Sequence, residues 1–383
     1  MKAKRIYLDY NATALMIPQA RERMIAAMEL TGNPSSVHGE GRKARAVVEA
    51  ARTSVAALVG GRPENVVFTS GATESATTVL TPRSMMGRAP VEISTLYVSA
   101  VEHPCVLGGG RFPSDKRVTV GVGETGIIDL PELERHLRAH DRDTGLAMVA
   151  IMFANNETGV IQPIREIARM LKPFGAVFVV DAVQAAGRIQ IDIGALGIDF
   201  LLLSSHKIGG PKGSGAIVSA GEMLMPVPLI TGGGQERGHR SGTENPAAIA
   251  GFGAAAERAL AGIDQMKSIL ALRDRMEAGM RAIAPDVVIY GETGERLPNT
   301  SFFALPGLKA ETAQIAFDLE GVALSAGSAC SAGKVGPSHV LSAMGQDADL
   351  GALRVSLGPS TLPEDIDGFL DAFGRINAKR ARG

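Results

Sequence analysis

Cysteine is scarce in this chain, since Cys105 and Cys330 are the only two in 383 residues. Two thiols cannot build a disulfide framework, and they cannot supply a zinc site of four thiolates. The seven His and two Cys also lack the spacings of common metal-binding motifs, so we expect no metal. Low cysteine content suits a reducing compartment, and we expect a cytoplasmic protein.

An excess of charge of one sign is missing as well. The chain has 39 Lys and Arg against 40 Asp and Glu, which gives a formal net charge of −1. We therefore expect no direct binding to nucleic acid or to an anionic membrane. No segment reaches the roughly 18 apolar residues that a membrane span needs, and the first residues lack the apolar core of a signal peptide.

The composition that remains is typical of a folded globular protein, with 45% apolar and 21% charged residues. Apolar runs alternate with amphipathic segments along the first 220 residues, which predicts an α/β fold with a mainly parallel sheet. Because these runs are continuously apolar, the strands are expected to be buried on both faces. We expect strands at 66–69, 96–99, 147–153, 176–180 and 200–204, and helical segments at 163–171, 246–284 and 362–376.

Three polar clusters follow expected buried strands, where open α/β sheets build their sites. The first is TSGATE at 69–74, where free amides at a helix start and the Thr73 hydroxyl could hold a phosphate; an ordinary capped helix is the alternative. The second is Asp181, a carboxylate that needs a partner such as a cationic ring nitrogen or an Arg. The third is SSHK at 204–207, where Lys207 could form a Schiff base, although a solvated surface lysine is more common.

Together the three clusters supply the parts of a pyridoxal phosphate site. These parts are a phosphate cradle, a carboxylate for the pyridinium nitrogen and a lysine for the aldehyde. The 26 residues from Asp181 to Lys207 allow one strand, a connection and the next strand. Both side chains could therefore reach the same crevice.

A competing motif is GVGETG at 121–126, which matches the glycine pattern of dinucleotide-binding loops. In such loops the glycines open the helix directly, whereas here Ile127 and Ile128 intervene and Asp129 with Pro131 indicates the helix start. We therefore predict a turn at this segment, and we consider an NAD-binding protein remote.

Cys330 has an unusual setting for a thiol, because it lies in SAGSACSAG at 325–333. These small residues have too little apolar bulk to bury it well, which favours a nucleophilic role through the thiolate. Cys105 lies among apolar neighbours in EHPCVL, and we expect it to be a small core residue.

From end to end the chain resembles the cysteine desulfurases of the NifS/IscS type, which are class-V aminotransferase-like enzymes of fold-type I. The motifs that carry the resemblance, in chain order, are YLDYNAT, GNPSSVHGEGRKAR, FTSGATES, VEHPCVL, MFANNETGVIQPI, VDAVQAAG, SSHKIGGPKGSGAI, GGGQERGHRSGTEN, SAGSACSAGKVGPSHVLSAMG and LRVSLG.

The resemblance implies a role for each matching residue. Lys207 would hold pyridoxal phosphate as a Schiff base, Asp181 would pair with the ring nitrogen, and His103 would lie over the ring. Asn156 and Gln184 would lie near the phenolic oxygen, and Asn156 also near the substrate. The phosphate would be held by Ala72, Thr73, Ser204, His206 and, from the second subunit of a homodimer, Thr243. Arg354 would bind the substrate carboxylate through its guanidinium fork.

The resemblance also implies the reaction, in which sulfur is removed from L-cysteine to give L-alanine and a persulfide on Cys330. The catalytic residues would be Lys207, Cys330 and His103, with stacking and proton transfer both open to the imidazole. The sulfur would pass to an acceptor or scaffold protein for iron-sulfur cluster or thio-cofactor synthesis or for tRNA thiolation. A transient role of Cys330 as an iron-sulfur ligand rests on the resemblance alone.

The family's two-domain plan places a large cofactor-binding domain at 13–250 and a smaller α/β domain at 1–12 and 251–383, with Cys330 on a loop of the smaller one. The nearest alternative functions are a selenocysteine lyase and a class-V aminotransferase. Transamination needs no Cys330, and selenocysteine cleavage can proceed without it. A scaffold protein without activity is a further alternative, but it would need no lysine, acid and thiol together.

Overall fold

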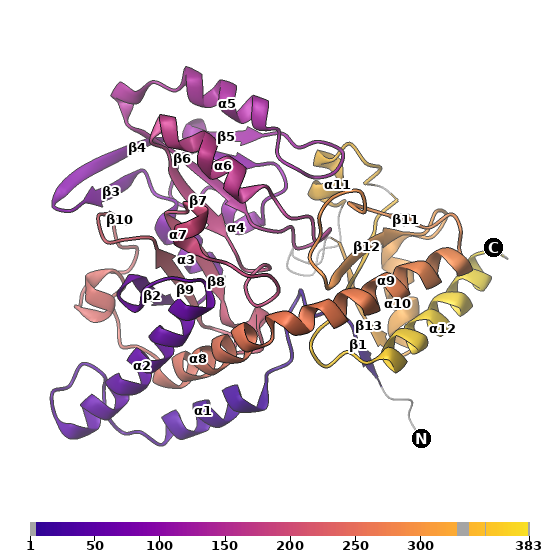
Figure 1. The fold of residues 1–383 in the computed structure, drawn as a ribbon, viewed down its shortest axis with the longest axis horizontal. Coiled ribbons are helices and arrows are strands. Elements are labelled where there is room, and N and C mark those ends of the chain that lie inside the picture. Colours follow the sequence, from indigo (N-terminus) through magenta and orange to yellow (C-terminus); the bar gives the residue numbers. More distant parts are fainter. Residues whose placement is uncertain (1–4, 328–336, 349, 382–383) are drawn as a thin grey trace.

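A computed structural model describes residues 5–327, 337–348 and 350–381. Within these ranges the chain forms a larger lobe around a nine-stranded sheet and a smaller lobe around a four-stranded sheet (Figure 1). Helices α8 (Pro246–Ala261) and α9 (Met266–Ile283) lead from the larger lobe to the smaller one.

The larger sheet is mixed, with the order β10-β3-β4-β6-β7-β8-β9-β2 and with β5 paired to β4. Its strands are β2 (Val66–Thr69), β3 (Arg83–Met86), β4 (Ala89–Ser99), β5 (Arg117–Val120), β6 (Leu146–Met152), β7 (Val177–Asp181), β8 (Phe200–Ser204), β9 (Gly215–Ser219) and β10 (Leu224–Pro226). Strands β4 to β8 run parallel at its centre, while β2, β9, β3 and β10 add antiparallel pairs. The predicted α/β fold is confirmed. The sequence pattern did not indicate the antiparallel strands at the two ends of the sheet.

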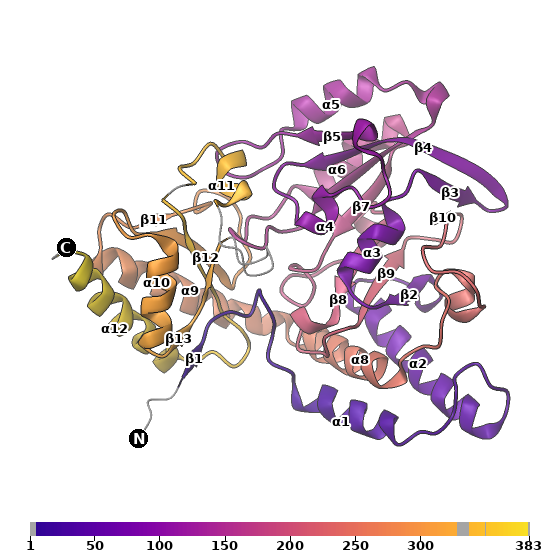
Figure 2. The ribbon, with the colours of Figure 1, turned by 180° about the vertical axis from the view of Figure 1, so that it is seen from behind.

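The sheet is buried on both faces, as its continuous apolar strands predicted. Along β6, Val149 and Ile151 belong to one core cluster, and Met148 and Ala150 belong to the cluster on the opposite face. Helices α3 (Ala72–Val79) and α4 (Pro104–Leu107) cover one face (Figure 2). The other face is covered by α2 (Gly39–Leu58), α5 (Leu130–Ala139), α6 (Ile164–Leu171), α7 (Ile193–Leu196) and α8. Helix α1 (Pro18–Met28) packs on α8.

The smaller lobe contains a four-stranded antiparallel sheet, with the order β11-β12-β15-β14. Its strands are β11 (Val288–Ile289), β12 (Thr300–Ala304), β14 (Ser325–Ala326) and β15 (Leu353–Ser356), and its helices are α9, α10 (Ala310–Leu319), α11 (His339–Ala343) and α12 (Pro363–Arg380). The start of the chain joins this lobe, because β1 (Ile6–Tyr7) pairs in parallel with β13 (Val322–Ala323). Phe303, Phe317, Phe369 and Phe373 form an aromatic group in its core.

Several local predictions are confirmed, and one needs correction. The segment 121–126 is a turn, and α5 begins after Asp129, whose side chain accepts a hydrogen bond from the Glu132 amide at 2.8 Å. The helical region predicted from 246 to 284 is interrupted, because α8 ends before Gly262 and a short 3₁₀ turn separates it from α9. Glycine is a poor helix former, which favours an interruption there.

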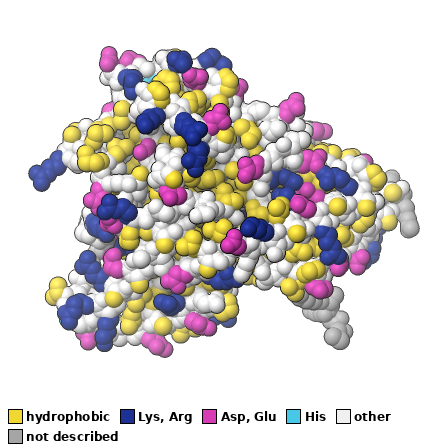
Figure 3. Space-filling view, in the orientation of Figure 1, with side chains coloured by type: hydrophobic (Ala, Val, Ile, Leu, Met, Phe, Trp, Pro, Cys, Tyr) yellow, Lys and Arg dark blue, Asp and Glu magenta, His cyan; other side chains and the backbone are white. Residues whose placement is uncertain are grey.

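None of the helices in the described ranges combines the length and apolarity needed to cross a membrane. On the face drawn in Figure 3, Lys and Arg side chains are interspersed with Asp and Glu side chains. That distribution agrees with the balanced charge of the sequence.

Candidate active site

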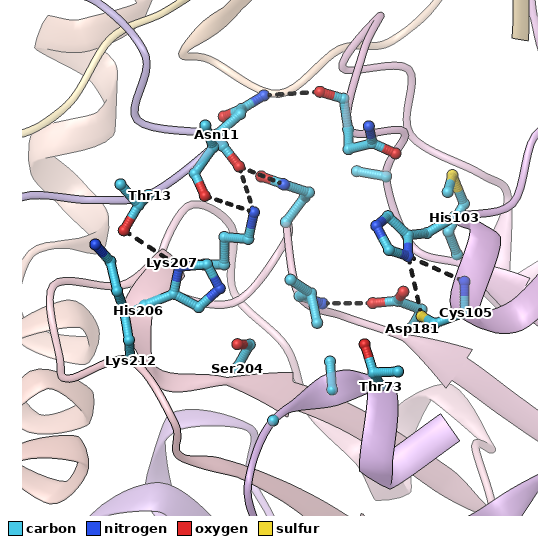
Figure 4. Close-up of a pocket in the computed structure, with 18 of the residues that line it drawn as sticks. Asn11, Thr13, Thr73, His103, Cys105, Asp181, Ser204, His206, Lys207 and Lys212 are labelled. Atoms are coloured by element: carbon cyan, nitrogen blue, oxygen red, sulfur yellow. Dashed lines mark hydrogen bonds between the residues drawn. The ribbon is translucent and has the colours of Figure 1, made fainter. Parts of the chain in front are cut away.

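A cavity of about 600 Å³ lies at the carboxyl ends of the central parallel strands (Figure 4). We call it the central cavity. Its lining includes Asn11, Ala12, Thr13, Ser70, Gly71, Ala72, Thr73, His103, Cys105, Met152, Ala154, Asn156, Asp181, Val183, Gln184, Ser204, His206, Lys207, Lys212, Gly213 and Arg354.

The parallel strands explain why residues so far apart in the chain meet here. In the register of the sheet, Met152 at the end of β6 lies beside Asp181 at the end of β7. Strand β8 follows in parallel, ends at Ser204 and leads directly into a short 3₁₀ helix that contains Lys207. The expectation that Asp181 and Lys207 reach one crevice is confirmed, because both line the central cavity.

Asp181 is a buried carboxylate, and its Oδ1 accepts a hydrogen bond from the Val183 amide at 2.9 Å. Burial raises the pKa of Asp181 from 3.8 to about 6, while the Val183 amide and the positive charge of Lys207 lower it. A cation placed against this carboxylate would favour its ionised form. The site is therefore suited to a positively charged ring nitrogen.

The Lys207 amine lies against main-chain carbonyls of the N-terminal segment. Its Nζ donates to the carbonyl oxygen of Asn11 at 2.6 Å and to that of Ala12 at 2.9 Å. These contacts direct the amine into the central cavity (Figure 4). An amine held beside a cavity is the group that attacks a carbonyl to form a Schiff base.

An anion cradle lies where α3 begins. Ala72 and Thr73 are in the first turn of this helix, whose free amides favour a phosphate. The turn packs closely on β9, since a Cβ at Gly215 would lie 2.6 Å from the Gly71 Cα. A side chain at Gly215 would push the cradle away from the sheet.

Ser204 and His206 line the cavity beside this cradle. His206 Nδ1 lies 3.2 Å from the Thr13 hydroxyl. Burial is the main cause that lowers the pKa of His206 from 6.5 to about 4, and the positive charges of Lys207 and Lys212 contribute. A neutral imidazole can hold a phosphate as a hydrogen-bond donor.

His103 immediately precedes α4 and also lines the cavity. Burial is the main cause that lowers its pKa from 6.5 to about 4, and the positive charges of Lys207 and His339 contribute. The imidazole is therefore neutral at pH 7. Its Nδ1 is 3.0 Å from the Cys105 sulfur, a contact visible in Figure 4.

Arg354 lies on β15 of the smaller lobe, is fully buried, and reaches the cavity from that side. One guanidinium nitrogen donates to the Asn156 carbonyl at 3.0 Å, and another pairs with Asp9 at 2.9 Å. Its Nε is buried and has no hydrogen-bond partner among the described residues. A guanidinium held in this way is suited to bind a carboxylate.

Asn11 joins the two lobes behind these groups. Its side-chain amide donates to the Asn156 carbonyl at 3.2 Å and to the Thr300 hydroxyl at 3.0 Å. Its own carbonyl accepts from Gln184 Nε2 at 3.1 Å as well as from Lys207. One buried asparagine thus positions side chains predicted to bind the cofactor.

The structure brings together most of the predicted site residues. Those lining the central cavity are Ala72, Thr73, His103, Asn156, Asp181, Gln184, Ser204, His206, Lys207 and Arg354. Thr243 is exposed and is not among the lining residues, so in a single chain it does not join the cavity. Cys330 lies outside the described residues.

Sequence reasoning missed Asn11, Thr13 and Lys212 as cavity residues, and it gave Cys105 a core role only. Cys105 packs on the core cluster under α3 and α4, as expected of a small core residue, but it also lines the cavity. The motifs YLDYNAT and GGPKGSG were recognised without roles for these three residues. Within the described ranges, no group of three or more His, Cys, Asp or Glu side chains is arranged to hold a metal ion.

The chain matches known proteins along nearly its whole length. The family model of the class-V aminotransferases matches residues 6–369. A cysteine desulfurase of Sinorhizobium fredii is 41% identical, and the similarity covers 98% of this chain and 97% of that protein.

Solved structures agree with this assignment. The NifS-like protein of Rickettsia africae superposes with a TM-score of 0.87 and 34% identity, covering 98% of this chain and 99% of that one. A protein described as SspA in complex with cysteine has a TM-score of 0.75 and 28% identity, covering 93% of this chain and all of that one. The chain therefore belongs to the class-V aminotransferase family, and its resemblance to the cysteine desulfurases of the NifS/IscS type is confirmed.

Proposed function

We propose that this protein is a cysteine desulfurase that uses pyridoxal phosphate and releases L-alanine from L-cysteine. One observation carries the proposal, namely that Lys207, Asp181 and the start of α3 all line the central cavity. The named function of the Sinorhizobium relative supports the reaction. The cysteine in the SspA complex supports the substrate.

The chemistry of the lining residues fits the cofactor. Ala72, Thr73, Ser204 and His206 would hold the phosphate, Asp181 the ring nitrogen and Lys207 the aldehyde carbon, with Asn156 and Gln184 near the phenolic oxygen. Two features of the cavity support this assignment: the buried carboxylate of Asp181, whose Oδ1 accepts a hydrogen bond from the Val183 amide, and the first turn of α3, whose amides favour an anion. When bound, pyridoxal phosphate supplies an electron sink for the pair left by the α-proton of the substrate.

The protein's own groups would then bind the substrate and move its protons. Arg354 would bind the substrate carboxylate, because its fork already faces the cavity beside Asn156. Lys207, once displaced by the substrate amine, would carry the α-proton. Asp181 would keep the ring nitrogen protonated through its negative charge.

Cys330 would take the sulfur. Its thiolate would attack the sulfur of the substrate, so that a new S–S bond forms as the C–S bond breaks. The carbon would keep the bonding electron pair and take up a proton, which completes alanine. The resulting persulfide on Cys330 would pass its outer sulfur to an acceptor or scaffold protein for iron-sulfur cluster or thio-cofactor synthesis.

We propose a homodimer in which Thr243 reaches the phosphate site of the second subunit. Its exposure on the single chain supports this, because a residue that serves a partner must be accessible. We also propose the two domains 13–250, and 1–12 with 251–383. Packing supports a division in this region, since Ala256 belongs to the core of the larger lobe and Met266 to that of the smaller one. By this criterion we move the proposed boundary from residue 250 toward the end of α8 at Ala261.

The function is tested by alanine production from L-cysteine with a reductant present. We expect the native protein to form alanine and Cys330→Ala to form none, while the visible absorbance of the bound cofactor is the same in both. Lys207→Ala should lose both the absorbance and the activity. Mass spectrometry of the native protein should find one additional sulfur atom on the peptide that contains Cys330.

Other outcomes identify the alternatives. Equal alanine production by the native protein and Cys330→Ala would exclude Cys330 as the nucleophile. Activity on selenocysteine but not on cysteine would favour a selenocysteine lyase, and a keto acid product would favour an aminotransferase. A protein without the cofactor absorbance, even after the cofactor is added, would remove the basis of the proposal.

A further inference from the structure

The orientation of His103 is fixed by two contacts to a single neighbour. Its Nδ1 lies 3.2 Å from the Cys105 amide nitrogen and 3.0 Å from the Cys105 sulfur. Figure 4 shows Nδ1 turned toward Cys105 and the other ring nitrogen turned away, on the side of the cavity where Lys207 lies. The ring therefore has one nitrogen held by the protein and one facing the cavity.

The Cys105 amide determines which nitrogen carries the proton. A main-chain N–H can only donate, so Nδ1 must accept and cannot itself be protonated. In a neutral imidazole the single proton is then on Nε2. The sequence left stacking, proton donation and proton uptake open for this residue, and the contact geometry restricts them.

The thiol of Cys105 acts in the same direction. Burial is the main cause that raises the pKa of Cys105 far above its usual range, and the negative charges of Asp181 and Glu102 add to it. The group is therefore a thiol whose proton can be donated to Nδ1. The Thr73 hydroxyl lowers this pKa, but burial outweighs it.

We propose that His103 acts as a neutral hydrogen-bond donor through Nε2–H, and that Cys105 is the positioning residue that fixes this tautomer. Neutral histidines serve other enzymes in this way, as electrophiles and not as bases. Such an imidazole has no free lone pair on the cavity side. It can stabilise negative charge on a bound molecule, but it cannot remove a proton there.

The charged groups around the ring favour the neutral form. Lys207, from the 3₁₀ helix after β8, and His339, from α11, both lower the pKa of His103. Asp181 and Glu102 lie near Cys105, and both act on its thiol. A proton on Nδ1 would set the Nδ1–H donor against the N–H donor of the Cys105 amide, which disfavours the imidazolium.

This inference concerns the same cavity as the proposed function, and it assigns the base role to Lys207 alone. It can be tested without substrate. The full-length protein is labelled with ¹⁵N-histidine, and long-range ¹H–¹⁵N spectra distinguish protonated from unprotonated ring nitrogens in each of the seven His residues. His103→Gln identifies the signals of His103.

We expect Nδ1 of His103 to be unprotonated and Nε2 protonated from pH 6 to pH 9. The matched pair Cys105→Ser and Cys105→Ala then tests the thiol, because both side chains are small and only serine keeps a donor. In Cys105→Ala the pKa of His103 should rise by about half a pH unit, the scale of one weak hydrogen bond. In Cys105→Ser it should remain near the native value.

A native His103 with its proton on Nδ1 would overturn the donor role, and this result needs no variant. An unchanged His103 pKa in Cys105→Ala would overturn the role of the Cys105 side chain. The signals of the other six histidines report whether each variant is folded. Because none of these spectra depends on alanine production, failure here and failure of the desulfurase proposal are separate results.

Discussion

The buried ion pair of Arg52 and Glu236 should contribute strongly to the stability of the larger lobe. The side chains are 5% and 2% exposed, and two hydrogen bonds of 2.7 and 2.8 Å join the guanidinium to the carboxylate. Arg52 also donates to the Val66 carbonyl at 2.8 Å, and Glu236 accepts from the Phe68 amide at 2.8 Å. Through these hydrogen bonds the ion pair links the segment around Glu236 to the edge strand β2.

Removing only the cation should cost more than removing both charges. Arg52→Met leaves the Glu236 carboxylate buried with the Phe68 amide as its remaining donor, and breaking such a pair costs about 3–5 kcal/mol. In Arg52→Met/Glu236→Gln the stranded charge is gone, and the amide oxygen can still accept from Phe68. We expect the double variant to recover about 2 kcal/mol of the loss.

Equilibrium urea unfolding, followed by circular dichroism at saturating cofactor and one protein concentration, measures these differences. The midpoints are compared at equal m-values. Arg62→Met is the control, because Arg62 pairs with Glu64 at the surface with its side chain 76% exposed, and its loss should cost less than about 1 kcal/mol. A double variant less stable than Arg52→Met would refute the reasoning, since the stranded charge would then not be the source of the cost.

Three further predictions concern Arg354, the cradle at the start of α3, and the buried carboxylate of Glu157, which is not among the lining residues of the central cavity. Arg354→Lys should raise KM for L-cysteine about tenfold with a smaller change in kcat, because a single ammonium group replaces the bidentate guanidinium fork. An unchanged KM in the alanine assay would exclude carboxylate binding by Arg354. Burial raises the pKa of Glu157 from 4.5 to about 7, although the Ser338 hydroxyl lowers it. The folded state therefore binds the Glu157 proton more tightly than the unfolded state does, and the protein loses stability as pH rises from about 4.5 to 7. Glutamine has no such proton to lose, so the Tm of Glu157→Gln minus the Tm of the native protein should be larger at pH 8 than at pH 5. An equal Tm difference at the two pH values would contradict a raised pKa for Glu157. Gly215→Ala should weaken binding of the cofactor phosphate, because the new Cβ would lie 2.6 Å from the Gly71 Cα. Equilibrium dialysis with pyridoxal phosphate measures the affinity, and an unchanged affinity would show that the cradle tolerates the methyl group.

Much of the site followed from local sequence because each group lies next to a buried strand. The apolar runs at 66–69 and 200–204 match β2 and β8 at both ends, since residues buried on both faces must be apolar throughout. Asp181 and Lys207 could then be placed at one edge, because parallel strands present their carboxyl ends together. The first half of β4 was missed because it is exposed and pairs with β3 in an antiparallel hairpin.

By itself, the sequence determined the α/β class, the strands at the centre of the sheet and the residues that follow them, because these depend on short apolar runs and their immediate neighbours. Only the tertiary structure decided that Asn11 and Thr13 reach the cavity, that Arg354 is held by Asp9, and that Cys105 faces His103 as well as the core. These contacts depend on how the two lobes and α4 pack around the sheet. No local pattern records such packing, because each side chain is compatible with several partners until the lobes meet.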